Sequence, residues 1–376
     1  MSDNPSFVLK SVLDVGYEDR AIPEISDNEV LVKVMKTGIC GSDVHYFAHG
    51  RIGDFIVENP MVLGHESSGI VFKVGSKVKN VGVGERVAIE PGAGCHSCEL
   101  CKAGKYHLCQ GMIFAATPPY DGTLARYYKV PADNAYTLPD GVSLEDGAMI
   151  EPLAVGVHSV ATLGNFRSGQ AAIVFGCGPV GLLCMAVAKA LGASRVIAVD
   201  IVASRLEFAK QHVATHTYLP PPPNEGESKI EFSQRNAAQL KAQLGISERG
   251  KDAIDLVVDA SGAEVSIQTA FYVAKAGGTI VQVGMGNPHI TINTQMLGNK
   301  ELNYKGSFRY GPGDYPFAID LVAQGKIDLK PFVTHRYKFE DALVAFKATQ
   351  AGKSEDGKAV IKIVISGPDV PVDSKL

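Results

Sequence analysis

The chain has 376 residues, of which 45% are hydrophobic and 20% charged, and its formal net charge is −4. This composition predicts a globular protein long enough for two domains. No apolar run reaches the length that crosses a bilayer, so a membrane protein is not expected. The chain has no long basic run, so nucleic-acid binding is not expected. The first residues lack the basic and apolar leader of a secretory signal.

Two kinds of strand pattern follow one another along the chain. Up to about residue 153, short alternating strands and glycine-rich turns predict a β-rich, barrel-like domain, with strands at residues 29–34, 68–74 and 86–89. From about residue 168, strands alternate with helices, which predicts a parallel, doubly wound α/β sheet. Its elements are expected as strands at 171–175, 195–199, 254–259 and 279–284, and helices at 180–191 and 264–275.

Two further segments complete this pattern. Four prolines followed by Asn, Gly and Ser predict an extended, solvated loop over residues 218–228. The chain becomes irregular after residue 284 and is expected to finish in a strand at 360–365.

Three potential metal ligands occur in the first part, in the motifs Cys40-Gly-Ser-Asp-Val-His-Tyr46 and Gly64-His65-Glu66. A thiolate, an imidazole and a carboxylate would leave the fourth position of a tetrahedral zinc open, as in catalytic sites. Taken singly, Cys40 is as well explained as a small buried hydrophobe and His65 as a core histidine. The three residues together predict a catalytic zinc site held by Cys40, His65 and Glu66.

A second potential zinc site is the cluster Cys95, Cys98, Cys101 and Cys109, four thiols within fifteen residues. One pass of chain with this spacing can wrap a tetrahedral ion. Two disulfides would be the alternative, but they require an oxidising compartment that nothing in the sequence indicates. We therefore expect a structural zinc here.

A dinucleotide fingerprint lies in the α/β part, where Gly176, Gly178 and Gly181 separate a strand from a helix and Asp200 ends the next strand. These glycines allow a tight turn, close approach of a pyrophosphate and close helix–strand packing. A carboxylate at Asp200 would accept hydrogen bonds from a ribose 2′-hydroxyl and repel a 2′-phosphate, so NAD is favoured over NADP. Alternatively, Asp200 caps the following helix, and Arg205 can lie over the adenine or ribose.

The chain resembles the zinc-dependent medium-chain dehydrogenases, and among them the polyol group of sorbitol, xylitol and L-arabinitol dehydrogenases. The resemblance covers nearly the whole length, and xylitol dehydrogenases (D-xylulose reductases) of fungi are most similar, particularly over residues 114–128. It rests on the two zinc motifs, the cysteine cluster and the glycine fingerprint, and on Phe114-Ala-Ala-Thr-Pro-Pro119, Glu151-Pro-Leu-Ala-Val-Gly-Val-His158 and Phe308-Arg-Tyr310. The proline-rich loop departs from the family pattern.

This resemblance implies a fold and a set of site residues. The fold would be a GroES-like catalytic domain at 1–155, completed by 303–376, and a Rossmann NAD-binding domain at 156–302. Substrate contacts are expected at Tyr46, Phe114, Thr117, Glu151, Arg309 and Tyr310. Coenzyme contacts are expected at Gly176, Gly178, Val180, Gly181, Asp200, Arg205, Val283, Gly284, Met285, Ser307, Phe308 and Arg309. For Arg309, a surface or phosphate contact is the alternative.

The predicted activity is NAD- and zinc-dependent oxidation of a polyol to a ketose, with xylitol to D-xylulose favoured, by hydride transfer from a zinc-bound alkoxide. Ser42, His45 and Glu151 are the candidate proton relay. The alternatives are an L-arabinitol or sorbitol dehydrogenase, a zinc alcohol or threonine dehydrogenase, and a redox-inactive NAD-binding protein. The family implies a homotetramer. Localisation is expected to be cytoplasmic, or peroxisomal through Ser374-Lys375-Leu376.

Overall fold

The computed structural model describes residues 3–372, and its chain forms two units. The first unit comprises Met1–Glu151 and Gly311–Leu376, and the second comprises Pro152–Tyr310. No helix within residues 3–372 combines the length and the apolar character needed to cross a membrane.

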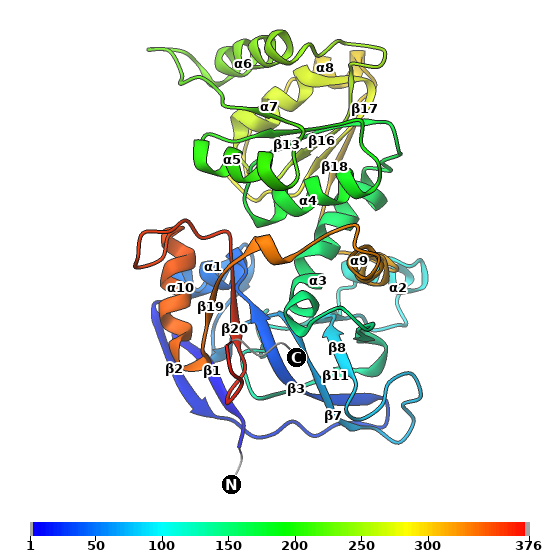
Figure 1. Ribbon diagram of the computed structural model, residues 1–376, viewed down its shortest axis with the longest axis vertical. Coiled ribbons are helices and arrows are strands. Elements are labelled where there is room, and N and C mark those ends of the chain that lie inside the picture. Colours follow the sequence, from blue (N-terminus) through cyan, green and yellow to red (C-terminus); the bar gives the residue numbers. More distant parts are fainter. Residues whose placement is uncertain (1–2, 373–376) are drawn as a thin grey trace. The chain divides into compact units, whose positions relative to one another are not determined.

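A seven-stranded sheet forms the centre of the first unit (Figure 1). Its strands, in spatial order, are β12 (Ala135–Thr137), β8 (Arg86–Ile89), β7 (Glu66–Val74), β3 (Glu29–Gly38), β20 (Lys362–Ser366) and β19 (Val333–Tyr337), and β11 (Tyr127–Pro131) also pairs with β3. Because β3 pairs with three strands, it lies in the interior and is buried at eight of its ten positions. Its Lys36 is buried as well, and its ammonium donates to Ser366 Oγ and to the carbonyl of Val372, at 2.9 Å each.

Smaller elements surround this sheet. They are the strands β1 (Pro5–Ser11), β2 (Asp14–Asp19), β4 (Arg51–Ile52), β5 (Phe55–Ile56), β6 (Met61–Val62), β9 (Gly92–Ala93) and β10 (Ile113–Phe114), and the helices α1 (Gly41–His49), α2 (Glu99–Lys102), α3 (Leu144–Val157), α9 (Asp314–Ala323) and α10 (Ala342–Ala351). Helix α1 buries Tyr46 and Phe47, and the Phe47 ring lies 6.0 Å from the ring of Phe346 on α10. This packing fixes the helix that begins directly after Cys40.

The second unit is a parallel six-stranded sheet with helices on both faces (Figure 1). Its strands run in the order β15 (His216–Tyr218), β14 (Arg195–Val199), β13 (Ala171–Phe175), β16 (Ile254–Asp259), β17 (Ala274–Gln282) and β18 (Asn303–Gly306). Its helices are α4 (Pro179–Ala190), α5 (Ala203–His212), α6 (Lys229–Leu244), α7 (Glu264–Val273) and α8 (Thr294–Asn299), and a π-helical turn, His158–Leu163, follows α3.

Side chains of alternate residues in the central strands point to opposite faces of this parallel sheet. Ile173 and Phe175 of β13 join a core with Leu240 of α6 and Phe271 of α7. Phe175 pairs with Val199 and with Asp259, so β13, β14 and β16 all end at the same edge. In open α/β sheets this carboxyl edge is where ligands bind.

The predicted fold class is confirmed, and the strands at 171–175, 195–199 and 254–259 match to the residue. Other boundaries differ from prediction: the strands expected at 29–34, 68–74 and 360–365 span Glu29–Gly38, Glu66–Val74 and Lys362–Ser366, and the helix expected at 180–191 spans Pro179–Ala190. The stretch after residue 284, expected to be irregular, holds α8, β18, α9, β19 and α10 before β20. Two further differences have an identifiable cause. The helix expected to reach residue 275 ends at Val273, and the strand expected at 279–284 spans Ala274–Gln282. The ammonium of Lys300 explains this end, because it donates to the carbonyls of Phe271, Tyr272 and Ala274 at 3.3, 3.1 and 2.9 Å. The predicted loop holds no helix or strand from Leu219 to Ser228.

A buried carboxylate connects the cysteine-rich segment to the barrel. Glu90, directly after β8, accepts hydrogen bonds from the hydroxyls of Tyr106 and of Tyr136, the latter at 2.8 Å. Tyr136 also stacks on Tyr315 of α9, with ring centroids 5.2 Å apart. Burial raises the pKa of Glu90 to about 7, against the opposing effect of the two tyrosine hydrogen bonds. The folded protein therefore holds a proton at Glu90 that the unfolded chain releases near pH 4.5.

Replacing Glu90 by Gln should flatten the dependence of stability on pH. A pKa raised in the folded state means that Glu90 stabilises the fold most when protonated, and that this contribution is lost as the pH rises from about 4.5 to about 7. The shift of about 2.5 pKa units sets an upper limit of about 3 kcal/mol. Thermal unfolding at pH 5 and pH 8 should show a smaller drop for Glu90→Gln than for the wild type.

The exposed neighbour Glu85, which accepts a hydrogen bond from Thr137 Oγ1 at 2.8 Å, supplies the control variant Glu85→Gln. Its drop between the two pH values should match that of the wild type. An equal drop in the wild type and Glu90→Gln would show that Glu90 does not titrate in this range.

Candidate functional site

Cys40, His65 and Glu66 come together where two neighbouring strands end. Cys40 lies between the end of β3 and the start of α1, and His65 immediately precedes β7. Since β3 and β7 pair antiparallel with Gly38 opposite Glu66, the residues that follow β3 meet the residues that begin β7. One sulfur, one imidazole nitrogen and one carboxylate oxygen all lie within 4.8 Å of one another, and both His65 and Glu66 are buried. This donor set fits a zinc ion that keeps an open position.

Asp43 orients the imidazole of this group. Its carboxylate is fully buried and lies 3.4 Å from His65 Nδ1. It also accepts hydrogen bonds from the backbone N–H groups of Gly64 and Cys40, at 2.9 and 3.2 Å. Burial alone would raise the pKa of Asp43, but His65 and these hydrogen bonds outweigh it and lower the pKa. With Nδ1 directed at Asp43, His65 presents Nε2 as the ligand atom.

The ammonium of Lys362 holds the carboxylate of Glu66 from the other side. Lys362 Nζ lies 2.5 Å from Glu66 Oε1, also pairs with Oε2, and donates to the carbonyl of Ile39 at 2.9 Å. Gly38 makes room for this pair: a Cβ at Gly38 would lie 2.2 Å from Glu66 Oε2 and 3.1 Å from Lys362 Cε. The lack of a side chain at Gly38 is therefore a requirement of the site.

The four predicted cysteines also form a metal-binding group. Cys95 Sγ lies 4.0 Å from Cys101 Sγ, and Cys98 Sγ lies 3.8 Å from Cys109 Sγ. Four sulfurs at about 2.3 Å from a tetrahedral zinc would be about 3.8 Å apart, so the arrangement fits the ion. Backbone N–H groups of Cys95, Cys98 and Cys101 donate to sulfurs of the cluster at 3.3–3.4 Å, which stabilises thiolates.

The predicted relay residues occupy different environments in the first unit. Ser42 and His45 lie three positions apart on α1, Ser42 partly buried and His45 exposed. Glu151 is buried in α3, close enough to Lys362 to raise the pKa of that ammonium together with Glu66 and Cys40, although burial opposes this. The structure thus gives one buried carboxylate close to Lys362 and one exposed imidazole on α1.

The other predicted substrate residues of the first unit are buried or partly buried. Tyr46 is buried on α1, and the Phe114 ring of β10 lies 5.8 Å from the ring of His65. Thr117 is partly buried and precedes a cis Pro118-Pro119 bond.

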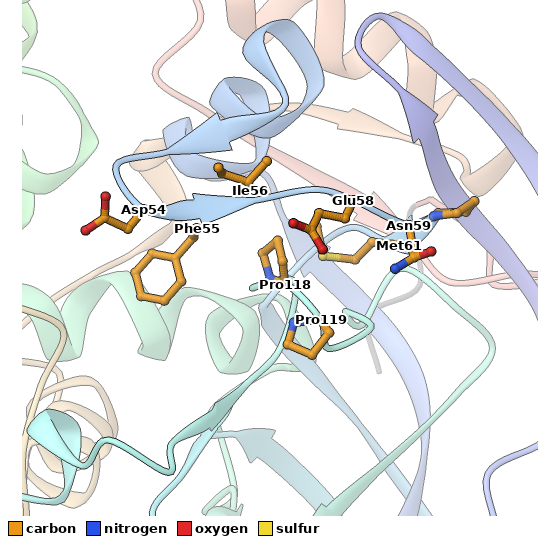
Figure 2. Close-up of a pocket in the computed structure, with 9 residues that line it drawn as sticks. Asp54, Phe55, Ile56, Glu58, Asn59, Met61, Pro118 and Pro119 are labelled. Carbon is orange, nitrogen blue, oxygen red and sulfur yellow. The ribbon is translucent and has the colours of Figure 1, made fainter.

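A separate cavity of about 320 Å³ lies beside this cis-proline segment (Figure 2). Residues 54–61, around the β4–β5 hairpin, form most of its lining, and Figure 2 shows Phe55 and Ile56 on opposite sides of the strand. Among the described residues that line it, none is a predicted substrate contact. No motif in the sequence indicates this cavity.

The glycine turn in the second unit has the geometry of a phosphate cradle. Gly176 has φ 96°, which a side chain would disfavour, and a Cβ at Gly181 would lie 1.9 Å from the carbonyl of Gly176. Nothing lies within 4 Å of the place where a Cβ of Gly178 would be. Gly178 is the N-cap of α4, and the unpaired N–H groups of a helix start suit a phosphate; Val180, in the first turn, is partly buried.

Asp200 has a structural role that the fingerprint alone does not reveal. One carboxylate oxygen accepts from the N–H of Cys177 at 2.7 Å and the other from the N–H of Val202 at 2.8 Å. The carboxylate therefore links the glycine turn to the start of α5, where Val202 is the N-cap. A carboxylate has about four acceptor positions, so two remain for a ligand. Arg205 lies in the first turn of α5 and is partly buried.

The remaining predicted coenzyme residues follow β17 and β18. Val283 and Gly284 both donate to the carbonyl of Asp259, at 2.8 and 2.9 Å, and Met285 is exposed. Ser307 Oγ lies 3.1 Å from Ser159 Oγ.

The segment after Ser307 has an unusual backbone. Arg309 has φ 57°, and its guanidinium carbon lies 4.6 Å from the centre of the half-exposed Phe308 ring. Tyr310 is buried.

Sequence reasoning missed three residues that organise the ligand group: Gly38, Asp43 and Lys362. Lys362 had a usable signal, because it interrupts the otherwise apolar run Val360-Ile-Lys-Ile-Val-Ile365 of a predicted buried strand. Asp43 lies within the motif Cys40-Gly-Ser-Asp-Val-His-Tyr46, but nothing in the motif marks it as a partner of His65. Nothing local marks Gly38 among the 40 glycines of the chain.

The chain is similar to known protein families in sequence and to known proteins in both sequence and structure. Residues 26–140 match the alcohol dehydrogenase GroES-like domain, and residues 179–324 match the zinc-binding dehydrogenase family. D-xylulose reductase A of Aspergillus niger is 54% identical over 371 residues, covering 98% of each chain. L-idonate 5-dehydrogenase of Escherichia coli superposes with a TM-score of 0.83 at 28% identity, covering 96% of this chain and 98% of that one. An alcohol dehydrogenase of E. coli CFT073, complexed with NADH, has the same TM-score and identity, covering 96% and 99%.

Replacing Gly38 by Ala should weaken metal binding at Cys40, His65 and Glu66. The new Cβ would collide with the Glu66 carboxylate, and overpacking of this kind costs about 1–3 kcal/mol. Metal analysis of the purified protein should show close to two zinc ions per chain for the wild type and about one for Gly38→Ala.

The control is Gly41→Ala, because nothing lies within 4 Å of a Cβ at this position and α1 begins there. It should keep the wild-type zinc content. Two zinc ions in Gly38→Ala would mean that the Glu66 carboxylate moves aside without loss of the ligand geometry.

Proposed function

The chain belongs to the zinc-binding alcohol dehydrogenase family, and we propose that it oxidises a polyol to a ketose with NAD⁺, with xylitol and D-xylulose as the substrate pair. The observation that carries this proposal is the grouping of Cys40, His65 and Glu66 within 4.8 Å in a chain 54% identical to a D-xylulose reductase. We further propose that the first unit is the catalytic domain and the second the NAD-binding domain.

Two metal groups have different roles in this proposal. Cys40, His65 and Glu66 would hold a catalytic zinc, and the four cysteines would hold a structural zinc. When bound, zinc supplies a Lewis acid that acidifies a substrate hydroxyl, and NAD⁺ supplies the hydride acceptor. Asp43 keeps His65 in the ligating orientation, and the buried Glu66 and Glu151 give the site its negative charge.

The chain's own side chains would carry the hydroxyl proton to solvent. Ser42 and His45 are three residues apart on α1, so their side chains lie on the same face of the helix. His45 is exposed and can release a proton to water, whereas Glu151 is buried and can hold one near the reacting hydroxyl. Tyr46, Phe114, Thr117 and Glu151 would contact the substrate, and the hydroxyls of Tyr46 and Thr117 and the carboxylate of Glu151 suit a polyol. The assignments of Arg309 and Tyr310 to the substrate stay predictions.

The coenzyme would lie on the glycine turn of the second unit, with Gly178 facing the pyrophosphate. Asp200 favours NAD because its two free acceptor positions suit a ribose hydroxyl, and its negative charge repels a 2′-phosphate. The predicted contacts from Val283 to Met285 and from Ser307 to Arg309 follow strands that end at this same edge of the sheet.

Assembly and location also remain proposals. We propose a homotetramer, in line with the family. We also propose a cytoplasmic or peroxisomal location; the C-terminal tripeptide Ser374-Lys375-Leu376 lies outside the described residues.

The substrate is tested by initial rates of NAD⁺ reduction with xylitol, sorbitol, L-arabinitol, threonine and ethanol. We expect xylitol to give the highest kcat/KM. Ethanol should be poor, because it leaves polar groups of the pocket unfilled. A profile led by ethanol or threonine would contradict the polyol assignment.

Ligand variants serve as controls for these rates. Cys40→Ser and His65→Ala should abolish turnover yet still bind NADH, as measured by fluorescence titration. Equal loss of NADH binding would show that the metal group was wrongly assigned.

Replacing Asp200 by Ser should lower the ratio of kcat/KM for NAD⁺ to that for NADP⁺ by about tenfold or more. A hydrogen bond to a charged group is worth about 1.5–3 kcal/mol, and the repulsion of a 2′-phosphate disappears as well. Because Asp200 also holds Cys177 and Val202, both coenzymes should bind more weakly, so the ratio is the informative quantity.

Asp255 offers a matched control for this variant. Its carboxylate accepts from the backbone N–H of Ala171 at 2.8 Å, at the opposite end of β13. Asp255→Ser should leave the coenzyme ratio unchanged. An unchanged ratio in Asp200→Ser would show that Asp200 acts only on the glycine turn.

A further inference from the structure

Lys362 is a buried cation in contact with the ligand group. It is the first residue of β20, and only 3% of its surface is exposed. An ammonium buried to this extent is costly unless it is paired and hydrogen-bonded. Lys362 meets both conditions through the carboxylate of Glu66 and the carbonyl of Ile39.

These two partners lie on the two segments that supply the metal ligands. Glu66 is itself a ligand, and Ile39 directly precedes the ligand Cys40. The register of the sheet produces this arrangement: β20 pairs with β3, and Ile39 N–H donates to the carbonyl of Ile363 at 3.0 Å. A single side chain from near the end of the chain therefore ties together two segments that are 27 residues apart in sequence.

The space for this contact depends on Gly38, which pairs with Glu66 on β7 and with Val364 on β20. Any side chain at this position would enter the volume that the carboxylate and the lysine share. The contact is thus supported by two independent features, the backbone register and the absence of a Cβ.

We propose that Lys362 is a positioning residue for the metal: it binds the Glu66 carboxylate and the Ile39 carbonyl, and so holds Glu66 and Cys40 in ligating positions. The inference rests on the proposed function, because it takes Cys40, His65 and Glu66 as the zinc ligands. Lys362 contacts both oxygens of the Glu66 carboxylate, which would supply one ligand atom to the zinc.

Electrostatics and positioning give opposite expectations for removal of the lysine. A positive charge beside a divalent cation repels it, so charge alone predicts tighter zinc binding without Lys362. Loss of a group that orients a ligand instead weakens metal binding, typically by about 10–100-fold. The sign of the change therefore distinguishes the two roles.

The experiment compares Lys362→Met with Lys36→Met in the full-length zinc-loaded protein. Lys36 is also a buried lysine and lies on β3, and its described hydrogen bonds go to the hydroxyl of Ser366 on β20 and to the carbonyls of Pro371 and Val372, none of which is a candidate metal ligand. Zinc per chain is measured during dialysis against graded concentrations of a chelator. The four-cysteine zinc, which neither lysine contacts in the described hydrogen bonds, is the internal reference.

For Lys362→Met we expect one zinc per chain to be lost at about 10–100-fold lower chelator concentration than in the wild type, while the other zinc stays. Lys36→Met should release both zinc ions as the wild type does. Cobalt substitution adds a spectroscopic measurement: the visible absorption of the cobalt that replaces the labile zinc should change in Lys362→Met and not in Lys36→Met.

Lys362→Arg covers the case in which Lys362→Met does not fold. Lys362→Arg keeps a cation that can hold a carboxylate, so it should retain the labile zinc better than Lys362→Met does. If only the arginine variant folds, its labile zinc should be lost at a chelator concentration below that of the wild type. Unchanged or tighter zinc binding in Lys362→Met would overturn the proposal. So would a cobalt spectrum that changes in Lys36→Met, at wild-type zinc binding, because the spectral change would then not be specific to Lys362. A wild-type protein that never holds a second zinc would instead contradict the proposed function.

Discussion

The antiparallel pairing of β3 with β7 is the constraint on which the candidate catalytic site depends. It places Gly38 opposite Glu66, and so brings the residues after one strand against the residues that begin the next. Every other contact of the group builds on that register. Asp43 can reach His65 because α1 begins where β3 ends, and Lys362 can reach Glu66 because β20 lies on the other side of β3. A one-residue slip of β7 against β3 would turn the Glu66 side chain to the opposite face of the sheet.

The two metal groups of the chain are built in different ways, and this explains how well each was predicted. The cysteine cluster is local: fifteen residues supply all four thiols, and the sulfur distances of 3.8 and 4.0 Å follow from a short wrapped segment. The spacing of the cysteines was therefore enough to predict its four ligands. The group of Cys40, His65 and Glu66 is non-local, and its ligands were recognised through their motifs. The residues that contact those ligands, Gly38, Asp43 and Lys362, come from two strands and one helix and carry no spacing signal.

The limits of the sequence prediction have the same physical origin. The strands at 171–175, 195–199 and 254–259 were predicted to the residue, because buried parallel strands appear as short apolar runs between polar turns. The end of α7 was misplaced because Lys300, 27 residues beyond Val273, donates to its last carbonyls. Glu90 was not predicted, since its tyrosine partners lie 16 and 46 residues away. Such errors arise wherever a distant side chain decides a local feature.

Asp200 has a structural role that neither predicted alternative describes in full. The sequence offered a choice between a ribose contact and a helix cap, and the structure shows that the carboxylate bonds the N-cap residue Val202 and also the glycine turn through Cys177. These bonds use two of about four acceptor positions, so a ribose contact is still possible. They also hold the carboxylate in place before any ligand arrives, which reduces the ordering cost of binding. Lys362 and Asp200 therefore share one feature: each is a buried charged side chain that hydrogen bonds to backbone groups hold in place.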